Sequence, residues 1–266
     1  MSAERSSRRH GLVVAAIAAL VVPAGAAPAA AEPPSIVRPE NASTMPLGEL
    51  GPQLFAGNCA RCHGIDGRGI RSPEDGDGDR GPSLRGVGAL AADFYLRTGY
   101  MPLGDPDDQP TRRDPLFSDR EITALVDYVA SLGAGPPIPT ARPEAGSLAE
   151  GRALFTEHCA GCHQVVGRGG VVTGARVPPL DEDTPTQVAE AVRIGPYVMP
   201  SFSEQHISDA ELDSIVRYVE YTQHPDDRGG WGIGSLGPVP EGMVTWFIGI
   251  VVLLAACIAI GQRLRS

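Results

Sequence analysis

The sequence carries the pattern Cys-x-x-Cys-His twice, first at residues 59–63 and again 100 positions later at residues 159–163. This pattern is the attachment signature of c-type haem. A turn with two residues between the cysteines lets both thiols reach vinyl groups on one edge of the porphyrin, and the histidine that follows lies beneath the iron. The pattern therefore predicts two covalently bound haem c groups, with these attachment and proximal residues: Cys59, Cys62 and His63, then Cys159, Cys162 and His163.

Other chemistries for the cysteines explain the pattern less well. A zinc ribbon places its two cysteine pairs about 15–20 residues apart, far closer than the pairs in this chain. A redox-active dithiol has no need of an adjacent histidine in both copies. A disulfide across only two residues is strained, although disulfides as such remain compatible with an extracytoplasmic location.

Two methionines at matching places in the repeat are candidates for the sixth iron ligand. Met101 follows His63 by 38 residues and Met199 follows His163 by 36, and each methionine is followed by proline. Methionine opposite histidine is the ligand pair of electron-transfer haems, and it raises the reduction potential.

Two arginines also match between the copies. Arg97 precedes Met101 by four residues and Arg193 precedes Met199 by six. A guanidinium group pairs well with a carboxylate, so both arginines are candidate contacts of the haem propionates. Solvated surface positions are the alternative.

The repeat extends beyond the cysteines, since four blocks recur in one order: "LFAGNCARCHGIDGRG" with "LFTEHCAGCHQVVGRG", "GPSL" with "VPPL", "LRTGYMP" with "VRIGPYVMP", and "SDREITALVDYV" with "SDAELDSIVRYV". Such self-similarity indicates two copies of one domain. Serine followed three residues later by glutamate predicts capped helices starting at Ser118, Ser147 and Ser208. The middle of each copy is rich in proline, glycine and acid and is predicted to be loop. Each copy has little core of its own, so it needs the haem to fold around.

The two ends of the chain are apolar. Residues 1–32 combine arginines, a short apolar run and alanine-rich cleavage-like sites, which is typical of a signal peptide or a signal anchor. Residues 243–261 contain 19 residues without a charge, enough for a transmembrane helix. Arginines after this helix predict a cytoplasmic C-terminus and haem domains on the extracytoplasmic side of the cell (plasma) membrane.

These features divide the chain into predicted segments. Cytochrome c domain 1 occupies residues 45–133, a proline- and glycine-rich linker 134–146, and domain 2 residues 147–224; a glycine-rich juxtamembrane segment, 225–242, precedes the transmembrane helix. The formal net charge is −10, and arginines gathered at both ends leave the middle more acidic still. This charge argues against a nucleic-acid partner, whereas the terminal helix predicts contact with membrane lipid.

Taken together, these residues resemble a known family, the dihaem cytochrome cc subunit of the actinobacterial menaquinol–cytochrome c reductase, or cytochrome bc complex. The likeness covers nearly the whole chain: an apolar N-terminal segment, two tandem CxxCH domains, the approach "GGWGIGSLGPVPEG" and one C-terminal membrane helix. It implies a mainly α fold with two tandem class I cytochrome c domains. It also implies the ligand set Cys59, Cys62, His63, Met101, Cys159, Cys162, His163 and Met199.

The function that the resemblance implies is an electron relay. A Rieske iron–sulfur protein beside cytochrome b would supply the electron, and a haem–copper cytochrome c oxidase would accept it. The chain would then be an enzyme only as the electron-transfer subunit of quinol–cytochrome-c reductase, a respiratory-chain translocase, with no substrate turnover and no catalytic residues of its own.

Two other functions remain open from the sequence. A dihaem peroxidase needs an iron with an open coordination site, which the two methionines argue against. A dihaem subunit of another membrane oxidase or of a dehydrogenase would use the same ligands, but the oxidase subunits of this kind carry their anchor ahead of the haem domains. A purely structural anchor would leave both ligand sets without a purpose.

Overall fold

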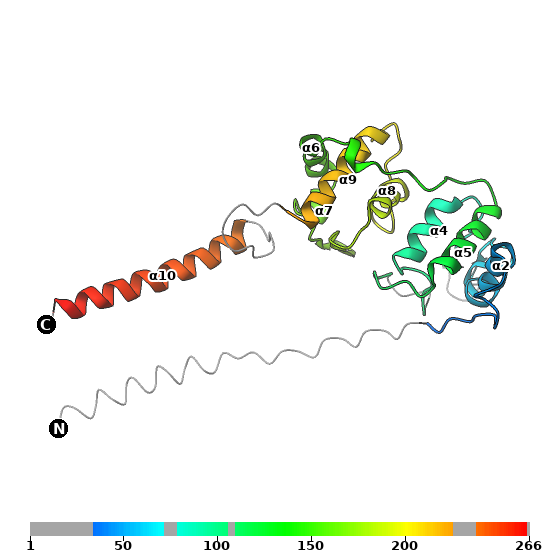
Figure 1. Ribbon diagram of the computed structural model, residues 1–266, viewed down its shortest axis with the longest axis horizontal. Coiled ribbons are helices and arrows are strands. Elements are labelled where there is room, and N and C mark those ends of the chain that lie inside the picture. The colour runs from blue at the N-terminus through cyan, green and yellow to red at the C-terminus, as the bar shows by residue number, and fades with distance from the viewer. Residues whose placement is uncertain (1–33, 72–78, 106–109, 226–237, 265–266) are drawn as a thin grey trace, which may run out of the picture. The chain divides into compact units, whose positions relative to one another are not determined.

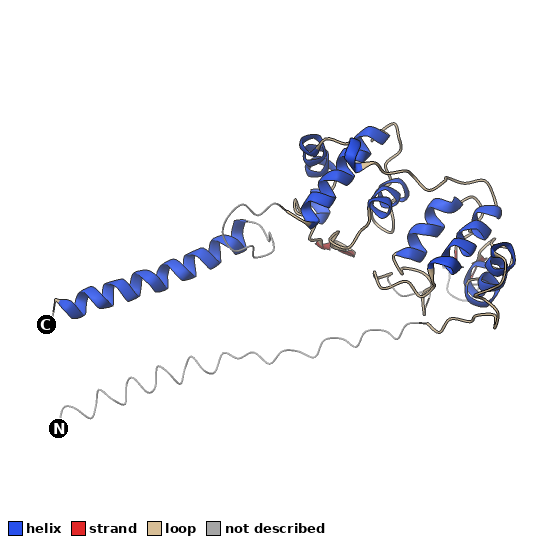
Figure 2. Ribbon diagram, viewed as in Figure 1, coloured by secondary structure: helices blue, strands red, loops and turns tan. Residues whose placement is uncertain are grey.

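The structure is a computed structural model that describes residues 34–71, 79–105, 110–225 and 238–264. The predicted segment 1–32 and most of the predicted segment 225–242 lie outside these residues. The described chain is mainly helical (Figures 1 and 2). Its elements, in order, are α2 (Leu47–Asn58), α3 (Ala60–His63), β1 (Ile70–Arg71), β2 (Asp79–Gly81), α4 (Gly88–Arg97), α5 (Asp119–Ser131), η1 (Pro143–Ala145), α6 (Leu148–His158), α7 (Ala160–His163), β3 (Gly170–Val172), β4 (Ala175–Val177), α8 (Pro185–Ile194), α9 (Asp209–Gln223) and α10 (Pro238–Arg263).

Two hydrophobic clusters form the core, one in each copy of the repeat. The first half, residues 34–133, packs α2 against α5 and α4 against α5. The second half, residues 141–225, packs α6 against α9 and α8 against α9. The fully buried side chains at the centres of the clusters include Leu50, Leu54, Phe55, Ile122 and Leu125 in the first half, and Phe155, Ile207, Ile215, Val216 and Val219 in the second.

The two helix crossings are built alike. Gly51 of α2 and Gly151 of α6 are buried, and a Cβ at either would meet a backbone carbonyl of the opposite helix at 2.2 Å and 1.8 Å, respectively. Beside each glycine an aromatic pair closes the crossing. Phe55 packs on Tyr128 and Phe155 on Tyr218, with ring centroids 5.0 and 5.3 Å apart. Duplicated residues thus produce duplicated packing, because only a missing side chain lets the helices approach this closely.

The predicted helix starts are confirmed. Ser118 and Ser208 accept a hydrogen bond from the backbone N–H of Glu121 and Glu211, and each glutamate accepts one in return from the serine N–H, so α5 and α9 begin with complete capping boxes. Ser147 caps α6 in one direction only. These bonds satisfy amide groups that the first helical turn otherwise leaves unpaired.

The prediction that the middle of each copy is loop is wrong in part. A ten-residue helix lies in each middle, α4 and α8. Helix α8 has its own capping box, formed by Thr184 and Gln187, with proline at its first position. Glycine and acid around these helices obscure a short helical run whose buried face becomes apparent only when it packs against the last helix of its half. Short antiparallel hairpins, β1–β2 and β3–β4, occupy part of the remainder.

The segment 134–146 joins the halves and is held at several points. The carbonyl of Pro136 accepts a hydrogen bond from the N–H of Leu90 at 3.3 Å. The N–H of Arg142 donates to the carboxylate of Asp213 at 2.7 Å. Both ends of the segment are therefore anchored on the half beside them.

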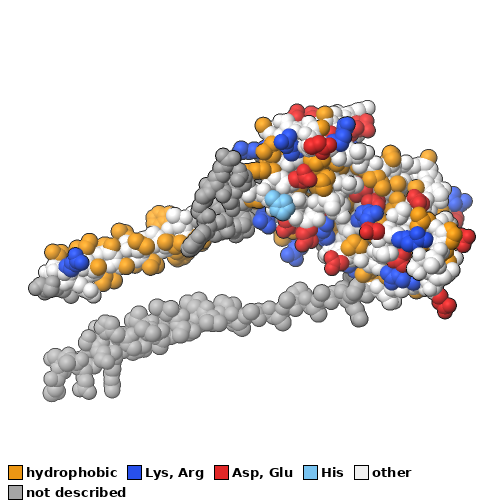
Figure 3. Space-filling view, in the orientation of Figure 1, with side chains coloured by type: hydrophobic (Ala, Val, Ile, Leu, Met, Phe, Trp, Pro, Cys, Tyr) orange, Lys and Arg blue, Asp and Glu red, His pale blue; other side chains and the backbone are white. Residues whose placement is uncertain are grey.

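Helix α10 contains an apolar segment, Gly242–Arg263, that is long enough to cross a membrane; its most apolar window has a mean hydropathy of 2.7, and none of that window is buried within the protein. At about 1.5 Å per residue, 22 helical residues span about 33 Å, close to the thickness of a hydrocarbon core. Hydrophobic side chains cover α10 in Figure 3, in contrast to the mixed charged surface of the other helices. The helix fits the predicted membrane anchor at 243–261.

Candidate functional site: two Cys-x-x-Cys-His turns on a shared cavity

Both Cys-x-x-Cys-His segments fold as a single helical turn directly after a longer helix. In the first half, the N–H of Cys59 donates to Phe55 at 2.8 Å and the N–H of His63 donates to Cys59 at 2.9 Å. The second half repeats these bonds at Cys159 and His163, both at 2.9 Å. Helical spacing of three and four residues places both thiols and the imidazole on the same side of the turn. No disulfide joins any two of the five cysteines, all of which lie among the described residues.

A proline carbonyl orients each histidine. The Nδ1 of His63 lies 2.7 Å from the carbonyl oxygen of Pro82, and the Nδ1 of His163 lies 3.2 Å from that of Pro178. A carbonyl can only accept, so Nδ1 carries the hydrogen in both rings and the lone pair is on Nε2. This tautomer is the one that presents Nε2 to a metal. Burial lowers the pKa of His163, which keeps its imidazole neutral.

The first cysteine of each pair is a poor thiolate. Burial, with the neighbouring Cys62 adding to it, raises the pKa of Cys59 to about 12. Burial and Cys162 raise the pKa of Cys159 to about 11. A redox-active dithiol needs a lowered pKa, so these surroundings argue against that chemistry and suit attachment through neutral thioether bonds.

Each candidate methionine follows a helix of the middle segment. Met101 comes after α4, and its N–H donates to Tyr95 at 3.0 Å. Gly195 ends α8 in the left-handed conformation (φ +63°), and a Cβ there would lie 2.4 Å from the N of Ser201. Only glycine fits this turn, and the turn carries the chain back to Met199, whose N–H donates to Pro196 at 3.0 Å. Both methionines are partly buried against the core of their half.

A cavity of about 780 Å³ brings these residues together. All eight predicted ligands line it, and so do the two prolines that orient the histidines. The rest of its wall is mostly apolar, and the core side chains exposed to it include Phe55, Leu96, Leu125, Phe155, Val192 and Ile215. The cavity is therefore a hydrophobic chamber with a thiol pair, an imidazole and a thioether in each half.

Comparison with known proteins shows which families this chain resembles. The family described as "Cytochrome c" matches residues 48–133, and the family described as "Cytochrome C oxidase, cbb3-type, subunit III" matches residues 146–219. The cytochrome bc1 complex cytochrome c subunit of Corynebacterium diphtheriae is 33% identical over 98% of this chain and 97% of its own length. That of Mycobacterium tuberculosis is 34% identical over 97% of this chain and 93% of its own.

The chain belongs to the cytochrome c subunits of the cytochrome bc1 complex.

A more distant relative is the cbb3-type cytochrome c oxidase subunit of Azospirillum sp., which is 28% identical over 64% of this chain and 60% of its own length. Both families that match the chain are electron-transfer cytochromes by name. Membership identifies the chain as an electron-transfer subunit of an oxidoreductase complex, and cytochrome c domains imply covalently bound haem c. The residues present fit that group, because each half supplies two thiols on one side of a turn, an imidazole with Nε2 free and an apolar wall.

Arg97 and Arg193 take part in helix-to-helix ion pairs. Arg97 donates to Asp93 within α4 and to Asp119 at the start of α5, both at 2.8 Å. Arg193 donates to Asp209 at the start of α9 at 2.7 Å, and to two nearby carbonyls. Neither arginine is among the residues that line the cavity. Their match in sequence reflects an equivalent tie between helices, and a propionate contact stays a prediction for both.

The arginines that do line the cavity are Arg112 and Arg176, which sequence reasoning missed. Arg176 directly precedes "VPPL" as Arg80 directly precedes "GPSL", so the repeat does mark this position, whereas Arg112 lies in a stretch that none of the four repeated blocks covers. The chain has three further histidines in the described residues, and none of them lies in a setting like those of His63 and His163. His206 pairs with Ser203 at 2.9 Å and His224 is exposed, whereas His158 is exposed at the rim of the cavity with its ring 5.9 Å from that of Phe202.

Proposed function

We propose that this chain is a membrane-anchored dihaem c-type cytochrome. It relays electrons from the Rieske protein of a menaquinol-oxidising cytochrome bc complex to a haem–copper terminal oxidase. The observation that carries the proposal is the pair of complete donor sets on one cavity, in a chain whose helix α10 is long and apolar enough to cross a membrane. Two sites in one tethered chain extend the distance over which electrons pass between fixed partners.

The proposal assigns a role to each donor. Two tandem class I cytochrome c domains, 45–133 and 147–224, each attach one haem c through their cysteine pair. His63 with Met101, and His163 with Met199, are the axial ligands. Haem c, when bound with this ligand pair, supplies a one-electron iron couple of raised potential.

The protein itself orients the imidazole rings and keeps water out of the cavity. The carbonyls of Pro82 and Pro178 hold the imidazole rings in one tautomer and one plane. The apolar wall excludes water, which stabilises the less charged reduced state of the site. The left-handed turn at Gly195 ends α8 and leads the chain to Met199, which lies after the cysteine turn in the sequence. None of these residues transfers a proton or a group, in keeping with a chain that turns over no substrate by itself.

The topology of the proposal follows from α10. The arginine at its end, Arg263, stays on the cytoplasmic side by the positive-inside rule. The two haem domains then lie on the extracytoplasmic side, where haem c attachment takes place. The N-terminal segment 1–32 is a signal peptide or a second anchor.

The first experiment is to solubilise native membranes gently, capture this chain by a tag and identify what accompanies it by mass spectrometry. Cytochrome b, the Rieske protein and haem–copper oxidase subunits together are the expected result. Recovery of the chain alone, or with an unrelated dehydrogenase, would refute the donor and acceptor. A Met199→Ala variant in the same membranes should slow oxygen consumption from menaquinol; unchanged electron delivery to the oxidase would refute the relay through the second site.

A second candidate is an electron-transfer subunit of a cbb3-like oxidase, favoured by the family match of residues 146–219 and by the relative in Azospirillum. Capture of oxidase subunits without cytochrome b would support it. A dihaem peroxidase is distinguished spectroscopically. Strong carbon monoxide binding by the reduced native protein would show an open iron site, whereas two methionine-ligated sites should bind it weakly.

A further inference from the structure

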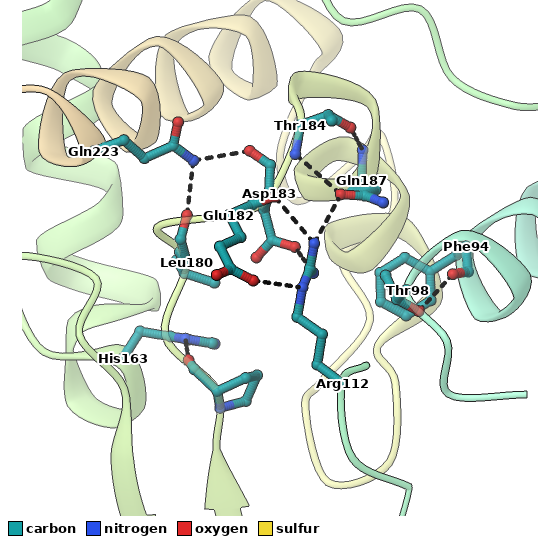
Figure 4. A network of polar contacts seen from close by, with 11 residues as sticks. Phe94, Thr98, Arg112, His163, Leu180, Glu182, Asp183, Thr184, Gln187 and Gln223 are labelled. Atoms are coloured by element: carbon teal, nitrogen blue, oxygen red, sulfur yellow. Dashed lines mark hydrogen bonds and ion pairs between the residues drawn. The ribbon is translucent and has the colours of Figure 1, made fainter. Parts of the chain in front are cut away.

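One arginine of the first half reaches into the second half. Arg112 lies in the segment after Met101, and its guanidinium group forms an ion pair with Asp183. Its Nη2 also donates to the carbonyl of Glu182 at 3.0 Å and to the side-chain oxygen of Gln187 at 3.2 Å. Figure 4 shows the guanidinium among these three partners. The fork of a guanidinium suits such a set, since it donates in fixed directions to several acceptors at once.

Two of the three partners of Arg112, Glu182 and Asp183, belong to the segment that orients His163. Residues 178–183 run from the carbonyl that accepts the Nδ1 hydrogen of His163 to the start of α8. Gln223 of α9 holds this segment from the other side, donating to the carbonyls of Leu180 at 2.7 Å and Asp183 at 2.8 Å. The segment is thus held by residues of the second half and, through Arg112, by the first half as well.

Arg112 also grips the first turn of α8. Gln187 accepts from the N–H of Thr184 at 3.0 Å as part of the capping box and from Arg112 as well. Helix α8 continues through Val188 and Val192, which line the cavity, and ends at the turn that leads to Met199. A contact at the start of α8 therefore affects the position of the cavity wall formed by this helix and of Met199 beyond its end.

The first site is held differently. Its equivalent segment, residues 82–87, is tied by Arg85, which donates to the carbonyl of Asp66 at 3.2 Å. Both residues belong to the first half. Arg112 therefore ties the segment that orients His163 to the first half, whereas Arg85 ties the equivalent segment 82–87 within its own half.

The ion pair between Arg112 and Asp183 is largely buried, so its loss should be costly. The side chains of Arg112 and Asp183 are 20% and 11% exposed, and both residues line the cavity. Burial raises the pKa of Asp183, and Arg112 acts against that rise. Removing one partner of a buried pair leaves an uncompensated charge, which is costly.

We propose that Arg112 is a positioning residue for the second haem site, supplied by the first half of the chain. It fixes the segment 178–183 and the start of α8. Its positive charge also compensates the carboxylates of Asp183 and, at 3.9 Å, Glu182, which would otherwise lower the reduction potential of that site. The inference rests on the proposed function, since it presupposes a haem in each half.

The test is a spectroelectrochemical titration of the purified full chain in detergent, with its haems attached. The variants are Arg112→Gln, Arg112→Lys and a control, Arg142→Gln. Arg142 also pairs with a buried aspartate, Asp213, at 3.6 Å, but it does not line the cavity. A Met199→His variant identifies the transition of the second site, because replacing methionine lowers its potential strongly.

The expected result is selective. Arg112→Gln shifts the reduction equilibrium of the second site about tenfold toward the oxidised form, which corresponds to about 59 mV for one electron, and leaves the first transition in place. Arg112→Lys recovers most of the shift, and Arg142→Gln moves neither transition. Equal movement of both transitions, no movement, or an equal effect of the control overturns the inference.

The experiment distinguishes failure of the proposed function from failure of the inference about Arg112. A wild-type protein that carries only one haem per chain, measured by haem absorbance against protein concentration, refutes the proposed function, and the inference falls with it. Should Arg112→Gln not accumulate, Asp183→Asn carries the test. That variant removes the negative charge while Arg112 remains, so the second transition should rise, and an unchanged or lowered transition overturns the inference.

Discussion

A buried carboxylic acid, Glu190, is expected to make the stability of this protein depend on pH. Its side chain is fully buried in α8, and no N–H or hydroxyl of the described residues donates to either of its oxygens. Its polar neighbour is Asp93 of α4, a second buried acid. Two adjacent carboxylates cannot both ionise readily. A protonated Glu190, in contrast, can donate its hydrogen to Asp93, which also accepts a hydrogen bond from Arg97.

The structure sets the direction and the size of the effect. Burial first, then the charge and hydrogen bond of Asp93, raise the pKa of Glu190 to about 8, while Arg97 opposes the rise. The folded protein therefore binds this proton more tightly than the unfolded chain does. The stabilising contribution of the proton is complete below the ordinary glutamate pKa of about 4.5 and is lost as the pH rises to about 8. At about 1.4 kcal/mol per pH unit, the loss is at most about 5 kcal/mol.

The perturbation is Glu190→Gln, whose amide donates to Asp93 at every pH. We expect wild type and variant to differ by less than about 1 kcal/mol in free energy of unfolding at pH 5, whereas at pH 9 the variant should be more stable by roughly 2–5 kcal/mol. The assay is urea unfolding of the haem-loaded chain at pH 5, 7 and 9. An exposed carboxylate variant, Glu204→Gln, serves as the control. A difference between wild type and Glu190→Gln that does not change over this range would refute the reasoning.

Three further predictions concern packing, capping and anchoring. Gly51→Ala should destabilise the first half by roughly 1–3 kcal/mol, because its Cβ would meet the carbonyl of Ala124 at 2.2 Å; Gly48→Ala on the same helix meets nothing within 4 Å and should be neutral or stabilising, so equal urea midpoints for the two variants would contradict the close-crossing argument. Ser208→Ala removes the cap of α9 and should lower the unfolding free energy by about 1 kcal/mol, measured by thermal denaturation, with Ser208→Thr retaining most of it. Truncation before α10 should release the protein from membranes in a flotation assay, and a chain that still floats would show that another segment anchors it.

The elements that sequence reasoning found are those governed by short-range rules. A Cys-x-x-Cys-His turn places its three donors within five residues, and the hydrogen bonds at Cys59 and Cys159 form as the pattern predicts. Capping boxes act over three residues, so the starts of α5 and α9 could also be predicted from the sequence. The apolar run of α10 needs only length and composition. The short helices α4 and α8 were missed because their burial depends on the helices that pack against them.

The sequence by itself singled out the candidate ligands, because the repeat marks them twice, and the structure places all eight on one cavity. The sequence did not determine which charges meet. The pairing of Arg112 with Asp183 joins residues 71 positions apart in different copies, and the approach of Glu190 to Asp93 joins acids with no matching partners in the repeat. The equivalent arginines 97 and 193 turned out to bind the first aspartate of the following helix in each half. Such contacts arise when two elements pack, and only the tertiary structure decides which side chains are left facing each other at low dielectric.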